Sequence, residues 1–223
     1  MKRMIGLVLL GLGCIVSANA QMGMDLFRRP AIAKAIHPVV GKGAQYQVTD
    51  KDDRDKGNTM ELGVVGKENV GGKAAYWMQF VSVKNGQSNV GKALITVDDF
   101  QFHRMIMEVP GQGAMELPVN MNPKSRENMN ESMNQWHSVG SDTVTVPAGT
   151  FSCEHWRNDK DNADIWTSDK VTPFGMVKEV RPSGTTVLVK VLDSVPDRIT
   201  GPVKQFDMQQ MMQQMQQRRQ QNQ

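Results

Sequence analysis

The tripeptide Cys153-Glu154-His155 combines residue types that could do chemistry at close spacing. On a β-strand, residues 153 and 155 project to the same face, so a thiolate and an imidazole could bind one metal ion. The chain also holds 17 methionines, and soft sulfur ligands favour Cu(I). A copper-binding protein using Cys153, His155 and methionine is therefore one hypothesis. Because Phe151 shares that face, the alternative is that Cys153 is an inert core residue.

Motifs of known enzyme classes give no support for catalysis. The sequence contains no GxSxG, HExxH, GxxxxGK[ST] or CxxC motif. The stretch from Asp50 to Glu61 resembles a calcium loop, but Arg54 and Asp55 occupy the positions where a ligand and a glycine are needed. We therefore expect a protein that is not an enzyme, with no catalytic residues and no cofactor.

The first 20 residues read as a secretory signal peptide. Lys2 and Arg3 precede a short apolar run, and Ala18-Asn19-Ala20 is a cleavage pattern, so the mature chain would begin at Gln21. A rival interpretation is a lipoprotein lipidated at Cys14, although Gly11-Leu12-Gly13 matches a lipobox poorly. We expect a periplasmic or secreted protein.

Removal of the leader leaves a nearly neutral chain. The formal net charge is +3, and Lys2 and Arg3 contribute two of these charges. A near-neutral protein lacks the basic surface that nucleic acids require, so that partner class is excluded. No later segment approaches the roughly 20 apolar residues that a membrane-spanning helix needs. Cys153 would be the only remaining thiol, which excludes an intramolecular disulfide.

Short extended segments separated by turn signals dominate the chain from residue 44 onward. Asn85-Gly86 and Ser183-Gly184 are typical of tight hairpins. The connections have hairpin length, which indicates an antiparallel sheet of about ten strands. The expected strands cover residues 44–49, 59–65, 73–84, 90–98, 102–109, 114–119, 142–146, 150–157, 163–168, 175–181 and 185–192.

Two segments have helical spacing. Residues 26–36 could form a short amphipathic helix, and Asn122-Pro123 could begin a second one that extends to Trp136-His137. In the expected strand 73–84, Trp77 and Val81 point to one face while Tyr76, Met78 and Phe80 point to the other. A sheet that is apolar on both faces needs a cover on its second face, and we expect the helices to supply part of it.

Three motifs resemble a pattern of uncharacterised exported bacterial proteins. They are Val146-Pro147-Ala148-Gly149-Thr150-Phe151, Asp164-Ile165-Trp166-Thr167-Ser168 and Pro173-Phe174-Gly175-Met176-Val177-Lys178. Those proteins are similar to the lipoprotein-localisation superfamily, typified by LolA, LolB and RseB. The resemblance implies a curved antiparallel half-barrel with helices against its concave apolar face, and a periplasmic carrier rather than a catalyst. It carries over no individual site residue.

The sequence thus predicts a mainly β (α+β) fold: a curved antiparallel half-barrel of about ten strands with one or two helices on the concave face. The expected division is a signal peptide at 1–20, a half-barrel domain at 21–203 and a Met/Gln-rich tail at 204–223. The expected function is binding or carriage of a hydrophobic ligand, either a lipid or an acylated partner. The candidate lining residues are Trp77, Phe80, Met105, Met107, Trp166 and Met176.

Two other functions stay open. One is the copper-binding or metal-stress protein that would use Cys153 and His155. The other is an envelope interaction module, in which Met208, Met211, Met212 and Met215 form one helical face of the tail and dock on a protein partner.

Overall fold

The structure is a computed structural model that describes residues 30–51, 58–84, 86–119 and 135–205. These residues form twelve β-strands and one helix of six residues, α2 (Pro30–Ala35). The strands are β1 (Gly43–Asp50), β2 (Thr59–Val70), β3 (Lys73–Lys84), β4 (Gln87–Thr96), β5 (Gln101–Val109), β6 (Gly113–Leu117), β7 (Trp136–Val146), β8 (Gly149–Asn158), β9 (Ala163–Thr167), β10 (Met176–Arg181), β11 (Gly184–Leu192) and β12 (Lys204–Gln205).

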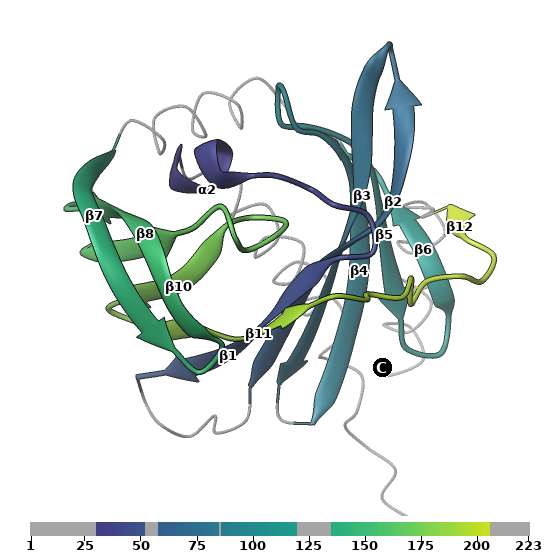
Figure 1. Ribbon diagram of the computed structural model, residues 1–223. Helices are drawn as coiled ribbons and strands as arrows, with labels where there is room; N and C mark the ends of the chain where they lie inside the picture. The colour runs from purple at the N-terminus through teal and green to yellow at the C-terminus, as the bar shows by residue number, and fades with distance from the viewer. Residues whose placement is uncertain (1–29, 52–57, 85, 120–134, 206–223) are drawn as a thin grey trace, which may run out of the picture.

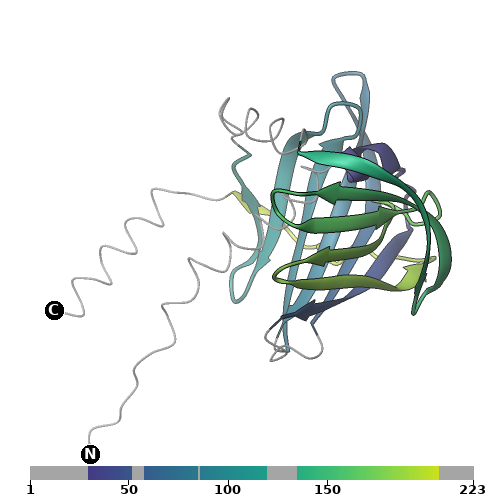
Figure 2. The same ribbon diagram turned by 90° about the vertical axis from the view of Figure 1, so that its left-hand side faces the viewer.

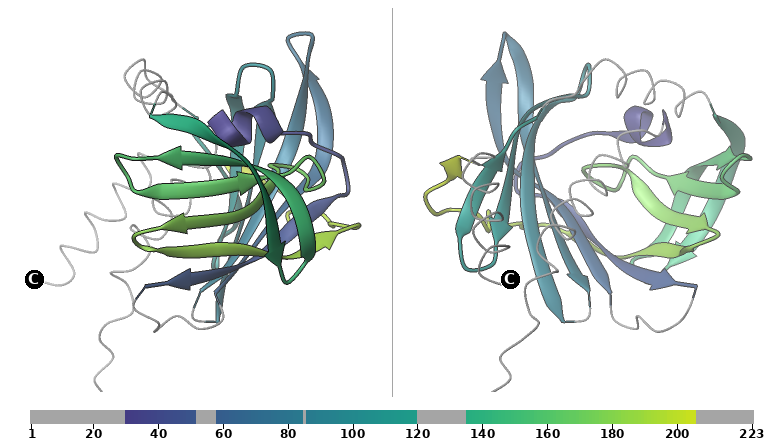
Figure 3. Two further views of the ribbon diagram at one scale, coloured as in Figure 1. Left: turned by 60° about the vertical axis from the view of Figure 1, so that its left-hand side comes forward. Right: turned by 180° about the vertical axis from the view of Figure 1, so that it is seen from behind.

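All twelve strands belong to one sheet, in the order β12-β6-β5-β4-β3-β2-β1-β11-β10-β9-β8-β7. Hairpin connections build two runs, β1 to β6 and β7 to β11, and the antiparallel pairing of β1 with β11 joins them. Only the short β12 is parallel to its neighbour, β6. Figure 1 shows the result as a strongly bent sheet, with β2–β6 as one limb, β7–β10 as the other, and β1 and β11 at the bend. Figure 3 shows the same two limbs from behind.

Buried apolar side chains fall into two clusters. The large core includes Met78 of β3 and Ile32 of α2, and α2 lies between the two limbs, so this cluster occupies the concave side. The small core includes Trp77 and Val81 of β3, on the opposite face. Strand β3 therefore buries both of its faces, and the predicted division of its side chains between them is confirmed.

A C-terminal strap, residues 193–203, covers the second face of the β2–β5 limb. Its Ile199 is 5% exposed and belongs to the small core. Val195 packs where Gly43 and Gly63 lie opposite each other in β1 and β2. A Cβ on Gly63 would lie 2.6 Å from Cγ1 of Val195, so the absence of side chains here is what lets the strap approach the sheet.

Polar side chains of the sheet bind the strap's backbone. Gln79 is 2% exposed; its Nε2 donates to the Pro196 carbonyl at 3.1 Å, and its Oε1 accepts from the Arg198 amide at 2.8 Å. Lys92, which lies opposite Gln79 in β4, donates to Oδ2 of Asp197 at 2.6 Å and to the Ile199 carbonyl at 2.8 Å. These bonds satisfy polar groups that the strap would otherwise bury without partners.

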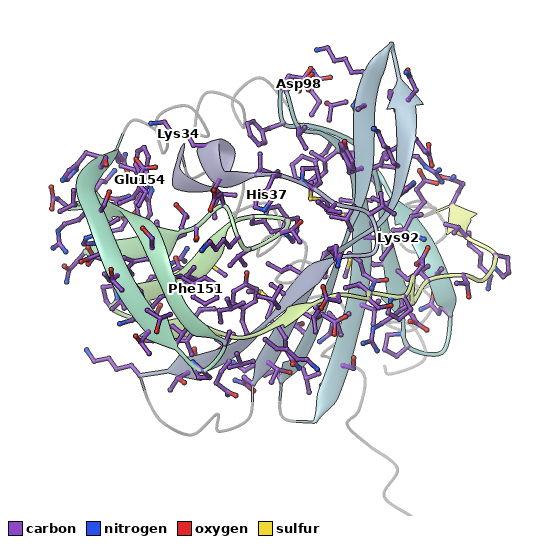
Figure 4. All side chains as sticks on the ribbon, viewed as in Figure 1. Lys34, His37, Lys92, Asp98, Phe151 and Glu154 are labelled. Carbon is purple, nitrogen blue, oxygen red and sulfur yellow. The ribbon has the colours of Figure 1, made fainter. Side chains whose placement is uncertain are left out.

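Helix α2 and the segment 168–175 pack against the concave side of the β7–β10 limb. Ile32 and Val171 are fully buried, and Phe174 is 3% exposed. The His37 amide donates to the Pro173 carbonyl at 3.0 Å, which ties the chain after α2 to this segment. Figure 4 places His37 between the two limbs, and Phe151 on the β7–β8 hairpin.

The predicted α+β fold with helices on the concave face is wrong. The described residues are nearly all β, in a single open sheet of twelve strands, and the six residues of α2 are the only helix among them, so the predicted helical cover of the concave face is not present there. Of the expected helix at 26–36, the structure describes only the six residues of α2 as helical, with Pro30 at the first position, where proline needs no amide partner. The second face of the sheet is covered by an extended strap instead.

The expected second helix lies mostly outside the described residues, but its end does not. Trp136 and His137, expected to be helical, begin strand β7, where they pair with Asn158 and Arg157 of β8. Strand β7 therefore starts six residues earlier than the expected strand at 142–146, because pairing with a long neighbour extends it.

Strand β12 forms where the Met/Gln-rich tail was expected to begin. The expected signal peptide, Cys14 and the methionines of the tail lie outside the described residues. In the described part of the chain, no helix is long and apolar enough to cross a membrane.

Candidate functional site

Cys153 and His155 share a face of β8, as the strand pattern predicts. Cys153 lies opposite Asp142 and His155 opposite Gly140, with no irregularity between these two pairs. The neighbouring Trp156 belongs to the other face, where Lys34 of α2 lies 4.5 Å from its ring centroid. Phe151, Cys153 and Trp156 all belong to the large core, whereas His155 is only partly buried.

The imidazole of His155 is surrounded by carboxylates. Its Nε2 hydrogen-bonds Oδ1 of Asp164 at 2.8 Å, and its Nδ1 lies 3.7 Å from Oδ2 of Asp142. The ring stacks on Trp166 at 4.4 Å between centroids, and the Trp166 Nε1 donates to Oδ2 of Asp142 at 3.1 Å. Lys178 lies 5.1 Å from the Trp166 centroid on the neighbouring strand. Both imidazole nitrogens face carboxylate oxygens of this polar cluster.

The Cys153 thiol has the properties of a core group. It is 3% exposed, and its Sγ donates to the Phe151 carbonyl at 3.6 Å. Burial, together with the negative charge of Asp142, raises the pKa of the thiol to about 11. Only a thiolate is a good metal ligand. Within the described residues, no group of three or more His, Cys, Asp or Glu side chains is arranged to hold a metal ion. The described surroundings of Cys153 and His155 therefore give the copper hypothesis no support.

Cys153 is expected to resist alkylation by iodoacetamide in the folded protein at pH 8, with labelling at least about tenfold slower than in urea. With its pKa raised to about 11, the thiol is almost entirely protonated at pH 8, and burial blocks access. Intact-mass spectrometry at timed intervals measures the labelling. Equal rates in the folded and the urea-unfolded protein would show that the thiol is exposed and reactive.

A threonine, a histidine and an aspartate meet where β4 turns into β5. Thr96 is 1% exposed, and its hydroxyl donates a hydrogen bond to the Asp99 carboxylate. The Nε2 of His103 lies 3.2 Å from the same Thr96 hydroxyl oxygen. Hydrogen bonds from Lys73 and then Thr96 lower the pKa of Asp99 to about 2. The ionised Asp99 carboxylate can only accept, so the Thr96 hydroxyl donates to it, and His103 donates to the Thr96 oxygen when its Nε2 carries the proton. These hydrogen bonds tie the turn between β4 and β5 to both strands.

Apolar residues form three rows across β3, β4 and β5 on the concave face, and we call this set the inner patch. In each row the three side chains lie opposite one another in register. The rows are Tyr76-Ile95-Phe102, Met78-Ala93-Met105 and Phe80-Gly91-Met107. All but Gly91 and Met107 belong to the large core or pack against it. Met107 is 3% exposed and follows Met105 on the same face by strand alternation.

Gly91 sets the shape of the third row. A Cβ at this position would lie 2.3 Å from Cζ of Phe80 and 2.4 Å from Sδ of Met107. The two side chains therefore lean over the glycine from both neighbouring strands. Both contacts are made by the ends of side chains rather than by backbone, and Met107 is unbranched, so they can shift without moving the strands.

Three aromatic residues of the inner patch keep part of their surface accessible: Tyr76, Phe80 and Phe102 are only partly buried. The members between them, including Ile95 at 0% and Met105 at 6%, are buried. The Nζ of Lys67 lies 5.2 Å from the Tyr76 ring centroid and places a cation at this end of the patch. The partly exposed rings form an apolar rim with one basic group beside it.

The structure brings together three of the six candidate lining residues: Phe80, Met105 and Met107 lie in the inner patch. Met176 is fully buried in the same large core but belongs to β10. Trp77 lies on the opposite face, where its Nε1 donates to Oε1 of Glu68 at 2.6 Å. Trp166 joins the polar cluster of His155. The binding role of the six residues stays a prediction.

Several members of the inner patch were not among the candidates (Tyr76, Met78, Gly91, Ala93, Ile95 and Phe102), and Phe102 is the one whose face simple alternation assigns wrongly. Its strand was expected, but the alternation from Met105 would place residue 102 on the other face. An irregularity between Leu94 and Ile95 changes the phase, so that Ile95 pairs with Phe102 while Leu94 pairs with Arg104. Such a bulge leaves no reliable signal in a single sequence.

Comparison with known proteins gives only distant likenesses. No protein-family model matches the chain. No curated protein matches it significantly. Among solved structures, a candidate lipoprotein from Parabacteroides distasonis ATCC 8503 shares 13% identity with a TM-score of 0.38, covering 70% of this chain and 97% of that one. A candidate exported protein with a YmcC-like fold from Bacteroides fragilis NCTC 9343 shares 14% identity at the same TM-score, covering 70% and 98%.

These two neighbours are described as a lipoprotein and an exported protein, but neither likeness is close enough to support a function for this chain. Membership of the lipoprotein-localisation superfamily is not shown by them.

Proposed function

We propose that the protein is exported and binds a hydrophobic ligand, an acyl chain or an acylated partner, without catalysing a reaction. The observation that carries the proposal is the inner patch, three uninterrupted apolar rows whose rim residues Tyr76, Phe80 and Phe102 keep accessible surface. A binding site for apolar ligands is typically lined by such side chains, with a few polar groups to orient the guest. Lys67 beside Tyr76 could pair with an acyl carboxylate or a lipid phosphate.

Methionine and glycine add to the support. Met78, Met105 and Met107 are adaptable, polarisable side chains that tolerate guests of different shapes. Because Gly91 has no side chain, the ends of Phe80 and Met107 occupy the space above it. A patch that served only as a rigid core would be expected to contain branched residues with well-defined rotamers.

Native mass spectrometry of the exported protein, purified without detergent, tests the proposal. We expect adducts that fragment as lipids. Replacing Phe80 and Phe102 with serine should lower the adduct fraction at least about tenfold, since each ring would contribute about 1.5–3 kcal/mol of apolar burial. The matched control is Val65→Ser, because Val65 is also partly buried but packs against the small core.

A bare mass for the unmodified protein, together with no binding of a fluorescent fatty acid, would overturn the proposal. Circular dichroism of each variant separates lost binding from lost folding. An equal loss of adduct in Val65→Ser and in the Phe80/Phe102 variant would place the ligand elsewhere and contradict the assigned site.

A further inference from the structure

Two buried polar atoms of the β7–β10 limb lack a hydrogen-bond partner. They are the indole nitrogen of Trp156, on β8, and the hydroxyl oxygen of Ser168, which directly follows β9. Trp156 is 5% exposed and Ser168 4%. No described residue offers either atom a partner. Buried polar atoms in folded proteins are nearly always paired, so two such atoms in one region indicate that a partner from outside binds there.

The last turn of α2 lies beside both residues. The Nζ of Lys34 is 4.5 Å from the ring centroid of Trp156. The Ser168 amide donates to the Gly175 carbonyl at 2.8 Å, and a Cβ on Gly175 would lie 2.4 Å from the Cβ of Ala35. Figure 2 looks onto the β7–β10 limb and shows α2, in dark purple, behind its upper strands. The helix therefore covers the part of the limb that holds the two unpaired atoms.

Helix α2 is suited to being displaced. It has six residues, and a helix of that length has no stability of its own in water. His37 fixes the chain directly after it: its amide donates to the Pro173 carbonyl at 3.0 Å, and its carbonyl accepts from the Thr172 hydroxyl at 2.9 Å. The helix can therefore swing about His37 while β1 keeps its place. Covering two unpaired polar atoms also raises the free energy of the closed arrangement.

The chemistry of these groups selects an oxygen acceptor with a negative charge. An indole N–H only donates, a serine hydroxyl can donate, and Lys34 adds a cation. The row that contains Trp156 also contains a carboxylate, because Trp156 lies opposite Ile165 and Ile165 opposite Glu179. That carboxylate is paired with Arg181.

We propose that α2 is a movable cover over a head-group site, in which Trp156 and Ser168 donate to a carboxylate or phosphate oxygen and Lys34 balances its charge. The inference rests on the proposed acyl ligand and adds where its polar end lies. Trp156 belongs to the same large core as Met78 and Met105 of the inner patch, so one apolar region connects the two places.

The competing position for the polar end is Lys67, which lies 5.2 Å from the Tyr76 ring centroid. The two positions differ in one respect. Within the described part of the chain, a buried donor without a partner accompanies the cation at Trp156 but not the cation at Tyr76.

Three ligands with one acyl chain and different ends test the proposal: dodecanoate, dodecyl phosphate and dodecanol. Displacement of the uncharged dye aminoanthracene from the exported protein gives each dissociation constant. We expect at least one anionic ligand to bind at least about tenfold more tightly than dodecanol, because hydrogen bonds to a charged oxygen are the stronger kind. The tighter of the two anions identifies the head group as carboxylate or phosphate.

Trp156→Phe and Ser168→Ala each remove one donor. Each should reduce the preference for the anion at least about threefold and leave dodecanol binding unchanged. Ser168→Ala removes a single oxygen atom, so it keeps the test valid if Trp156→Phe disturbs the fold. Lys67→Met is the matched control, because it removes the cation beside Tyr76 and should leave the preference intact.

Hydrogen exchange tests the cover. The Lys34 and Ala35 amides should exchange at least about threefold faster with the preferred anion bound, because the helix is then displaced. Unchanged or slower exchange would show that α2 does not move aside. Equal affinity for all three ligands would overturn the head-group site and leave the acyl site standing, whereas no binding of any of them would overturn the proposed function as well. A preference lost in Lys67→Met but kept in Trp156→Phe and Ser168→Ala would place the polar end beside Tyr76 and refute the inference.

Discussion

Lys92→Met is expected to lower the free energy of unfolding by about 3 kcal/mol, because it breaks a largely buried ion pair and leaves the partner groups behind. The Lys92 side chain is 10% exposed, and its Nζ donates to Asp197 at 2.6 Å and to the Ile199 carbonyl at 2.8 Å. Methionine keeps most of the aliphatic packing of lysine but supplies no donor. The Asp197 carboxylate and the Ile199 carbonyl would then lose their partner beneath the C-terminal strap.

Urea unfolding followed by tryptophan fluorescence measures this loss, and hydrogen exchange of the strap amides shows whether the strap detaches. The matched control is Lys42→Met. Lys42 pairs with Asp193 of the same strap at the same 2.6 Å, but its side chain is 41% exposed and that of Asp193 is 89% exposed. An exposed pair contributes about 0–1 kcal/mol. Similar effects in the two variants would show that burial does not distinguish them and that Lys92 does not anchor the strap.

Gly43→Ala is expected to lower the free energy of unfolding by about 3 kcal/mol through overpacking. The added Cβ would lie 2.4 Å from the Leu62 carbonyl oxygen and 2.7 Å from Cγ2 of Val195. A backbone oxygen inside a paired strand cannot move away as a side-chain end can. The added methyl group must therefore distort either the pairing of β1 with β2 or the packing of Val195 against them.

Gly201→Ala provides the control, since nothing lies within 4 Å of a Cβ at that position. Alanine there should change stability by less than about 1 kcal/mol, and by restricting the unfolded chain it could increase stability. Differential scanning calorimetry gives both values. A Gly43→Ala protein as stable as the control would mean that the close approach of β1, β2 and the strap is not required for the fold.

Local sequence patterns predicted much of the sheet. The alternation in residues 73–84 assigned Trp77 and Tyr76 to different faces, and the structure places them in different clusters. Asn85-Gly86 marked the tight turn between β3 and β4, where Gly86 has a φ of 75° that few other residues adopt. These features depend on neighbours in the chain, so a single sequence contains them.

The candidate site was predictable only in part. Phe80, Met105 and Met107 were chosen by residue type and strand, and their common face follows from simple alternation. Phe102 was missed, and Trp136 was expected to be helical, because a bulge or a long partner strand changed the local outcome. Each of these irregularities is decided by pairing with another strand rather than by the residue's own neighbours.

The sequence by itself determined that the chain is dominated by short antiparallel strands and that β3 must bury both faces. The tertiary structure alone decided what covers the second face. Gln79 and Lys92 bind strap residues that lie more than a hundred positions later in the chain, so an extended segment covers this face. The alternation of apolar residues predicts that a face must be covered, but it does not say which segment covers it. That depends on contacts between distant parts of the chain. Gly43 and Gly63 leave the space that Val195 fills, and buried polar groups of the sheet hydrogen-bond the strap's backbone.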